Sequence, residues 1–182
     1  MNHGRIIIIT GAPGTGKTTI SSIVAQESDL DKSVHMHTDD FYHYLSKGAI
    51  PPHLPESNEQ NLIVIEAFSE AAMRYARGGY DVIVDGIIGP WFLKPWLDTA
   101  RKGYEVHYII LRADKEETLK RAINRAKLDQ EANTELVETM WHQFQNLGLY
   151  ESHVIPTTRA TIPATVAAIK EKLSAKTALL CS

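Results

Sequence analysis

The chain has 182 residues, of which 43% are hydrophobic and 23% are charged, and its formal net charge is −3. These values predict one globular domain with a core of ordinary size, and the weakly acidic balance disfavours nucleic acid as the partner. One cysteine, Cys181, excludes an intrachain disulfide framework and is typical of a reducing cytoplasm. The first residues are too few and too polar for a signal peptide, and the apolar runs are too short to span a bilayer. We therefore expect a cytoplasmic protein with no membrane partner.

The first predicted strand, residues 5–10, leads into Gly11-Ala12-Pro13-Gly14-Thr15-Gly16-Lys17-Thr18. This segment fits the P-loop pattern G-x-x-x-x-G-K-[ST] at every fixed position. A helix is predicted next, over residues 17–27, so the motif lies in its expected setting of strand, loop and helix. A Rossmann loop is disfavoured because Thr19 stands where the third glycine of that pattern belongs.

The chemistry of such a loop is anion binding. Its glycines permit a tight turn in which successive N–H groups point inward, and the helix start adds the positive end of its dipole. Lys17 supplies charge for the β- and γ-phosphates, and the Thr18 hydroxyl suits Mg²⁺. The predicted nucleotide-binding residues here are Gly11, Ala12, Pro13, Gly14, Thr15, Gly16, Lys17, Thr18 and Thr19.

The second predicted strand, residues 34–38, ends at two consecutive aspartates, and a short helix is expected over residues 41–46. Because neighbouring strand residues point to opposite faces, we expect only Asp39 to face the site and Asp40 to cap the short helix. Asp39 is the candidate base. Its alternative interpretation is a surface or capping carboxylate.

Two histidines of this strand, His35 and His37, share one strand face and suggest a metal pair. The sequence offers no third ligand at a recognisable spacing. We therefore interpret both as packed or surface histidines.

A proline-rich stretch precedes a predicted helix over residues 59–77 and a third strand over residues 80–84. Asp85 follows this apolar strand as a Walker-B acid does, and it is expected to hold Mg²⁺ through water or to orient the acceptor. The alternative is a turn-forming aspartate before Gly86. The aromatic residues that follow fit either a pocket wall or the core: Trp91, Phe92 and Trp96.

Strands and helices alternate to the end of the chain, which predicts a parallel α/β sheet with ligands at the carboxyl ends of its strands. Asp114 and Glu117 have the spacing of a capping box, and Thr161 is a candidate helix cap. The remaining predicted elements are strands 106–111 and 153–155, and helices 114–127, 134–147 and 163–173.

The P-loop, the run Asp39-Asp40-Phe41-Tyr42, Asp85-Gly86 and the helix around Arg121 together resemble the small P-loop kinases of nucleoside-monophosphate-kinase architecture. Within these, the chain is similar to the gluconate/shikimate kinase-like and chloramphenicol-phosphotransferase-like groups. The resemblance implies a three-layer P-loop NTPase fold with a five-stranded parallel sheet flanked by helices. It also implies a single domain over residues 1–182, with a substrate-binding region near residues 40–61 and a small lid near residues 126–133.

The resemblance further implies a kinase that uses ATP and Mg²⁺ to phosphorylate a hydroxyl of a small molecule, as a monomer or homodimer. Lys17, Asp39 and Arg125 are its implied catalytic residues, and Thr18 and Asp85 its implied metal ligands. Arg121 and Arg159 are implied nucleotide contacts, with residues 156–159 as the adenine loop. Which arginine contacts adenine and which contacts phosphate stays open.

Other functions are weighed against this one. A GTPase is disfavoured because no Asn-Lys-x-Asp signature is present, and motor or AAA-type ATPases generally need a larger module. Two alternatives remain: a kinase for 5′-hydroxyl ends of polynucleotides or tRNA, and a non-catalytic nucleotide-binding or toxin-like module.

Overall fold

A computed structural model describes residues 4–129 and 134–180, including their side chains except those of residues 125–129. Five parallel strands form one sheet in the order β2-β3-β1-β4-β5, which confirms the predicted α/β fold class. The strands are β1 (Ile6–Thr10), β2 (Ser33–His37), β3 (Asp81–Asp85), β4 (Val106–Arg112) and β5 (Val154–Pro156).

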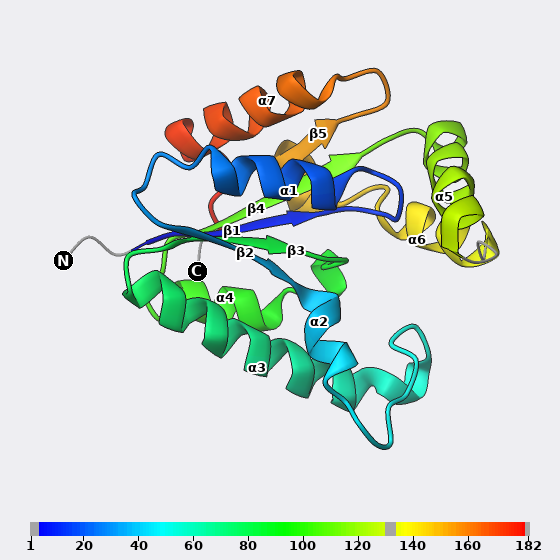
Figure 1. Ribbon diagram of the computed structural model, residues 1–182, viewed down its shortest axis with the longest axis horizontal. Coiled ribbons are helices and arrows are strands. Elements are labelled where there is room, and N and C mark those ends of the chain that lie inside the picture. The colour runs from blue at the N-terminus through cyan, green and yellow to red at the C-terminus, as the bar shows by residue number, and fades with distance from the viewer. Residues whose placement is uncertain (1–3, 130–133, 181–182) are drawn as a thin grey trace.

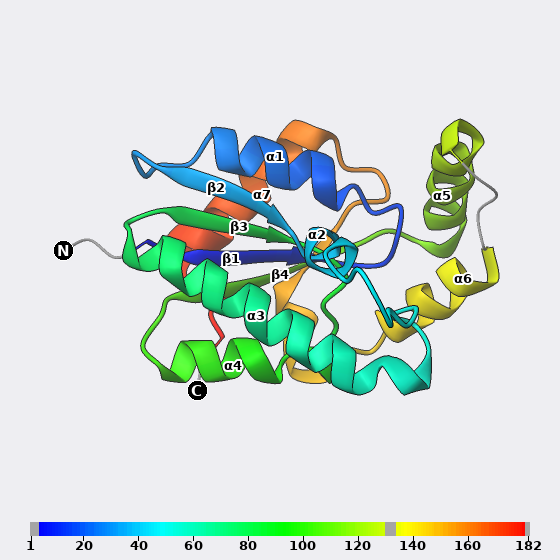
Figure 2. The same ribbon diagram turned by 60° about the horizontal axis from the view of Figure 1, so that its bottom comes forward.

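Helices cover both faces of the sheet, so the molecule has three layers (Figure 1). Two helices, α1 and α7, lie on one face, and α3 and α4 lie on the other, as the turned view also shows (Figure 2). The helices are α1 (Lys17–Gln26), α2 (Thr38–His43), α3 (Asn58–Arg77), α4 (Lys94–Arg101), α5 (Lys115–Asp129), α6 (Thr134–Gln143) and α7 (Ile162–Ala175). Short 3-10 turns are η1 (Pro55–Ser57), η2 (Pro90–Phe92) and η3 (Gly148–His153).

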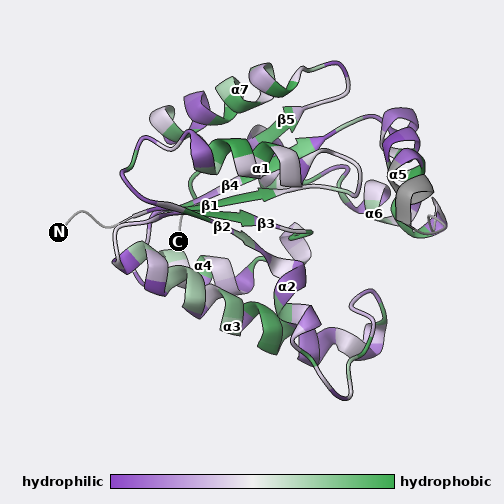
Figure 3. Ribbon diagram, in the orientation of Figure 1, coloured by the Kyte–Doolittle hydropathy of each residue, from purple (hydrophilic) through white to green (hydrophobic). Residues whose placement is uncertain are grey.

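The central strand β1 is apolar on both faces because each face packs on a helix layer. Ile6 and Ile8 join the core under α3 and α4, whereas Ile7 and Ile9 join the core under α1 and α7. All four are fully buried, and each contributes about 1.5–3 kcal/mol of hydrophobic stabilisation. The strands therefore colour as hydrophobic, while much of α5, beyond the carboxyl ends of the strands, is hydrophilic (Figure 3).

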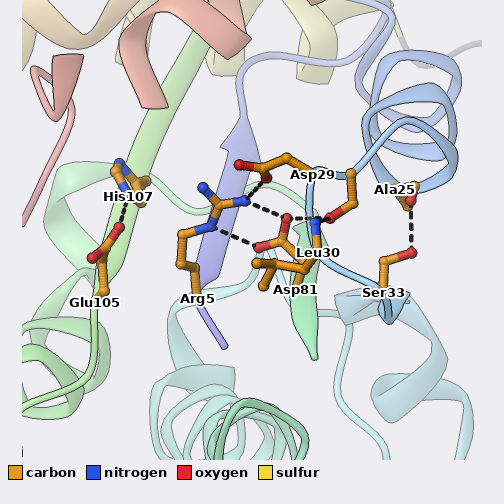
Figure 4. Close-up of polar contacts among 9 residues, drawn as sticks. Arg5, Ala25, Asp29, Leu30, Ser33, Asp81, Glu105 and His107 are labelled. Atoms are coloured by element: carbon orange, nitrogen blue, oxygen red, sulfur yellow. Dashed lines mark hydrogen bonds and ion pairs between the residues drawn. The ribbon is translucent and has the colours of Figure 1, made fainter. Parts of the chain in front are cut away.

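A polar cluster ties the amino ends of the strands together (Figure 4). Arg5 donates from Nε to Asp81 Oδ1 at 3.1 Å and from Nη2 to Asp81 Oδ2 at 2.7 Å, and it also pairs with Asp29. Ser28 Oγ donates to Asp81 Oδ2 at 2.7 Å. The buried Asp81 carboxylate thus accepts three hydrogen bonds, which connect β1, β3 and the segment after α1.

Both expected helix caps form, but only the Asp114 half of the predicted capping box does. The Glu117 carboxylate instead pairs with Arg121, and the Asp114 N–H donates to Thr158 Oγ1. Asp114 Oδ1 accepts from the Glu117 backbone N–H at 2.8 Å at the start of α5, and Thr161 Oγ1 accepts from the Ala164 N–H at 3.3 Å at the start of α7. Each cap satisfies an N–H group that has no partner inside its helix.

Two helix boundaries differ from the sequence prediction. The short helix after β2 spans Thr38–His43 rather than residues 41–46, so it begins where the strand stops. The helix predicted over residues 134–147 ends at Gln143, and η3 follows. Asn146 and Gly148 have positive φ, of 53° and 59°, and this left-handed backbone prevents the helix from continuing.

The proline-rich stretch before α3 forms no long helix or strand, but hydrogen bonds fix its conformation. Gln60 clamps it, because its side-chain amide donates to the Ile50 carbonyl and accepts from the Ile50 N–H, both at 2.8 Å. Ser57 Oγ donates to the Pro52 carbonyl at 2.9 Å. The described part of the chain contains no helix with the length and apolarity that a membrane crossing needs.

Candidate functional site

The P-loop connects β1 to α1 and has the backbone that its glycines predict. Gly11, Gly14 and Gly16 have φ values of 146°, 80° and 89°, which lie in regions that favour glycine. Gly16 is the N-cap of α1, and no side chain caps this helix. The first N–H groups of a helix have no partner inside it and point toward its N-terminus, where the helix dipole favours negative charge.

Helix α5 packs directly on this loop. A Cβ at Gly14 would lie 2.8 Å from the Thr118 carbonyl oxygen and 3.4 Å from Arg121 Cβ, so the contact tolerates only glycine. Within the loop, Thr15 Oγ1 and Lys17 Nζ each donate to the Ala12 carbonyl at 2.9 Å. Lys17 thus lies folded back over the loop, beside the helix start.

A cavity of about 700 Å³ opens beside the loop, at the carboxyl ends of the strands. Its lining includes the segments that follow the neighbouring strands β1 and β3, and the helices after these strands, α1 and α4, cover opposite faces of the sheet (Figure 1). This is the switch point at which parallel α/β sheets bind ligands. Several predicted site residues meet there. The described residues that line it are Pro13, Gly14, Gly16, Lys17, Thr18, Thr19, His37, Asp39, Asp85, Gly86, Ile87 and Arg121.

The two aspartates after β2 lie in the first turn of α2, not on a strand. The expectation that they point to opposite strand faces was therefore wrong in its premise, and Asp40 does not cap a helix beginning at Phe41. Asp39 nevertheless lines the cavity. Next to it, burial and the Asp39 charge raise the pKa of Tyr42 to about 12, so its phenol stays protonated at neutral pH.

Asp85 ends β3 with a side chain only 3% exposed. Its burial favours the neutral acid, but the donor groups of His35 and Thr18 and the positive charge of Lys17 outweigh that effect and lower the pKa of Asp85. The carboxylate is therefore ionised at neutral pH, next to the Thr18 hydroxyl. A carboxylate and a hydroxyl are oxygen ligands that suit Mg²⁺, so the predicted metal residues fit that ion.

The glycine after Asp85 fixes the spacing between β3 and α2. A Cβ at Gly86 would lie 2.0 Å from Thr38 Oγ1 and 2.8 Å from Thr38 Cγ2. Because Thr38 is buried, this contact sets how close the start of α2, and with it Asp39, lies to the end of β3.

The sequence offers no third metal-binding side chain near His35 and His37 at a recognisable spacing, but the pairing of the strands brings Asp85 beside them. β2 pairs with β3 so that His37 is the register partner of Asp85. Asp85 Oδ2 lies 3.1 Å from His37 Nδ1 and 3.5 Å from His35 Nε2. The sequence shows that the two histidines share one strand face, because they are two residues apart. It does not show the pairing of β2 with β3, which places Asp85 beside them.

The predicted arginines differ in position. Arg121 lines the cavity, where its Nε donates to Glu117 Oε1 at 2.7 Å and its Nη2 donates to the Thr157 carbonyl at 3.2 Å. It therefore joins α5 to the predicted adenine loop. Arg159 is exposed and is not among the described residues that line the cavity. The Arg125 side chain, and residues 130–133 of the predicted lid, lie outside the part that the structure describes.

The aromatic residues after Asp85 divide between the core and the surface. Trp96 is fully buried in the core with Phe68, and the two rings meet edge to face with centroids 6.1 Å apart. Trp91 is 53% exposed and packs on Phe144. Neither tryptophan lines the described part of the P-loop cavity.

Solved structures of kinases share this fold. The Mycobacterium tuberculosis APS kinase CysC, in complex with AMPPNP and APS, matches with a TM-score of 0.71 at 15% identity, over 96% of this chain and 99% of that chain. A gluconokinase from Sinorhizobium meliloti 1021 matches with a TM-score of 0.63 at 14% identity, over 97% of this chain and 99% of that one. These likenesses show the fold and confirm the kinase-like architecture implied by the sequence.

A component of the Pnkp1/Rnl/Hen1 RNA repair complex also matches, with a TM-score of 0.65 at 20% identity, over 88% of this chain and 50% of that chain. No curated protein sequence matches significantly.

A family model described as an AAA domain (AAA_18) matches residues 7–141. The expectation that the chain is too short for an AAA-type domain is therefore wrong. The matched region includes the P-loop, Asp39, Asp85 and Arg121. Because the model matches more than half of the 182 residues, the chain belongs to the AAA domain family of P-loop proteins.

Proposed function

We propose that this chain is a kinase that transfers the γ-phosphoryl group of ATP to a hydroxyl group of a small molecule. The observation that carries the proposal is the shared cavity. Lys17 and Thr18 line it on the P-loop side, and Asp39 in the first turn of α2 and Asp85 at the end of β3 also line it. In this proposal the loop side of the cavity would hold the triphosphate, and a carboxylate of the same cavity would receive the alcohol. The APS kinase and gluconokinase likenesses support the proposal at the level of the fold.

In the proposed reaction, the acceptor hydroxyl oxygen attacks the γ-phosphorus of ATP. A new O–P bond forms, the bond to the bridging oxygen of the β-phosphate breaks, and ADP leaves. Asp39 orients the hydroxyl and accepts its proton. Lys17 turns from the Ala12 carbonyl to the phosphates, where it offsets their negative charge.

Mg²⁺, when bound, neutralises charge on the β- and γ-phosphates, and Thr18 and Asp85 would hold it. Arg121, fixed by Glu117, would contact the nucleotide from α5. We also propose that Arg125 and Arg159 assist in nucleotide binding or charge neutralisation, within a single domain whose residues 40–61 bind the acceptor and whose residues 126–133 form the lid. Lid closure would exclude water and suppress ATP hydrolysis.

The acceptor is to be found by screening a metabolite and antibiotic library for ADP release, with the Lys17→Ala protein as the control. We expect release only with certain hydroxyl compounds and its loss in the control. Release that persists in the Lys17→Ala protein would contradict the proposed site.

Asp39→Asn tests the proposed base against a matched control, Asp40→Asn, which alters the neighbouring exposed carboxylate on the same helix turn. Loss of a general base typically costs about 10²- to 10⁴-fold in rate. We expect a fall of that size for Asp39→Asn with ATP affinity nearly unchanged, and little effect for Asp40→Asn. Equal transfer activity of the two variants would rule out Asp39 as the base, whereas ATP binding without transfer in the unmodified chain would favour a non-catalytic nucleotide-binding module.

The likeness to the RNA repair complex favours one second candidate, a kinase for the 5′-hydroxyl end of a polynucleotide. The screen should therefore include a 5′-hydroxyl oligonucleotide. Phosphorylation of the oligonucleotide, but of no small molecule, would select this second candidate.

A further inference from the structure

Three side chains that commonly bind metals meet at the carboxyl ends of β2 and β3. His37 is the register partner of Asp85, and His35 lies two residues earlier on the same strand face. Their ligand atoms all lie within 4.8 Å of one another, and within the described residues they form the only such group of three histidine, cysteine or acidic residues.

The polar atoms of this cluster are buried and incompletely satisfied. Asp85 Oδ2 lies 3.1 Å from His37 Nδ1 and 3.5 Å from His35 Nε2, but neither Asp85 Oδ2 nor His35 Nε2 makes a hydrogen bond of good geometry within the described part of the chain. The Asp85 side chain is 3% exposed and that of His35 is 17% exposed, so water reaches them poorly. Buried polar atoms without partners destabilise a fold, and a shared ligand would satisfy both atoms at once.

We propose that His35, His37 and Asp85 bind one divalent transition-metal ion such as Zn²⁺. Imidazole nitrogen with one carboxylate suits Zn²⁺, whereas Mg²⁺ favours oxygen ligands alone, so this site is distinct in chemistry from the proposed nucleotide-linked Mg²⁺. Two atoms that each lie about 2.1 Å from one ion are at most about 4.2 Å apart. Small rotations of the two rings would therefore complete the site.

The ion would keep one open coordination position. His37 and Asp85 both line the cavity beside the P-loop, so a fourth ligand would come from that side, as water or as a group of a bound molecule. Because Asp85 would serve both ions, transition-metal binding would withdraw its carboxylate from Mg²⁺ and inhibit phosphoryl transfer. This consequence rests on the proposed kinase function, whereas the binding itself does not.

The test uses the full chain without nucleotide and Co²⁺ as the probe, because Co²⁺ takes Zn²⁺ sites and absorbs visible light when bound by protein ligands. We expect one equivalent of Co²⁺ to bind and Zn²⁺ to displace it. Replacing even outer residues of a metal site typically weakens affinity about 10- to 100-fold. We therefore expect His35→Ala and His37→Ala to weaken Co²⁺ binding at least about tenfold.

His43→Ala is the matched control, because His43 is an exposed histidine at the end of α2, outside the cluster. It should bind Co²⁺ like the unmodified chain. His37 is 36% exposed on its side chain, so its replacement is expected to leave the fold intact, which far-ultraviolet circular dichroism would check. The proposal is overturned if the unmodified chain shows no saturable visible band, or if the cluster variants bind Co²⁺ as tightly as His43→Ala. Since no nucleotide is present, a failed kinase screen would not affect this result.

Discussion

At the scale of single residues, the site depends on two glycines that let backbone segments approach closely. Gly14 lets α5 pack on the P-loop, and Gly86 lets the start of α2 pack on the end of β3. Neither contact is visible in a sequence motif, because the partners, Thr118 and Thr38, are distant in the chain. Asp39 and Asp85 owe their shared cavity to the second contact.

Gly86→Ala tests this dependence. The added methyl would lie 2.0 Å from Thr38 Oγ1, and overpacking of this kind costs about 1–3 kcal/mol. We expect a loss of that size in the free energy of unfolding, measured in urea, together with a larger loss of activity as Asp39 shifts. Combining Gly86→Ala with Thr38→Ala should recover part of the stability. A Gly86→Ala protein as stable and active as the original would rule out the close packing.

At the scale of elements, the sequence predicted the order and type of the main strands and helices because each carries a strong local pattern. β1 is a continuous β-branched run, and caps at Asp114 and Thr161 mark α5 and α7. The start of α2 was misplaced because Thr38 continues a strand-like pattern, whereas the pairing of β2 with β3 stops at His37 and Asp85.

The candidate site, like the strands and helices, was predictable where local patterns mark it. The P-loop residues, Asp39, Asp85 and Arg121 were found from motifs and strand ends, and all contribute to one cavity or its loop. The cluster of His35 and His37 with Asp85 was missed because β2 and β3 are separated by α2 and α3. Their register is set by the packing of both strands in the sheet, which no local pattern encodes.

The cap of α5 should matter to stability alone. Removal of an N-cap side chain typically costs about 0.5–2 kcal/mol. We expect Asp114→Ala to lower the free energy of unfolding by about 1 kcal/mol, because the Glu117 N–H loses its acceptor. Asp114→Asn, which can still accept this hydrogen bond, should lose much less. Equal losses in the two variants, measured by urea unfolding, would show that the carboxylate charge and not the hydrogen bond is responsible.

The side chain of Arg121, on α5, should matter to nucleotide binding. Arg121 is fixed by Glu117 at the cavity, whereas the neighbouring Lys120 is 68% exposed on its side chain. We expect Arg121→Ala to weaken ATP binding about tenfold, which corresponds to about 1.4 kcal/mol, and Lys120→Ala to leave it nearly unchanged. Calorimetric titration with ATP measures both. Similar affinities for both variants would exclude Arg121 as a nucleotide contact.

At the scale of the whole molecule, the carboxyl and amino ends of the strands differ in their surroundings. The carboxyl ends border the P-loop cavity, while at the amino ends Arg5 and Asp81 connect β1 and β3. The last described residues add contacts at the amino ends, because Leu179 bridges to His107 and the Leu180 N–H donates to the Val106 carbonyl at 2.8 Å.

His107, near the amino end of β4, makes the stability of the whole fold depend on pH. Its side chain is fully buried, and this burial lowers its pKa more than the hydrogen bond with Glu105, at 2.9 Å, raises it (Figure 4). In the unfolded chain the imidazole has its ordinary pKa of about 6.5. Below that pH the unfolded chain binds a proton that the folded chain resists, so stability must fall as the pH falls.

We therefore expect the free energy of unfolding to decrease between about pH 7.5 and about pH 5.5, and to decrease less steeply in His107→Gln, whose amide can still donate to Glu105. Glu105 has a lowered pKa and loses its contribution only at more acidic pH, so it does not affect this window. Burial also lowers the pKa of His153. His153 therefore also makes the free energy of unfolding fall as the pH falls, and this contribution remains in His107→Gln. Urea unfolding across this pH range measures each slope. Identical slopes in the original chain and in His107→Gln would show that His107 titrates alike in the folded and unfolded chains.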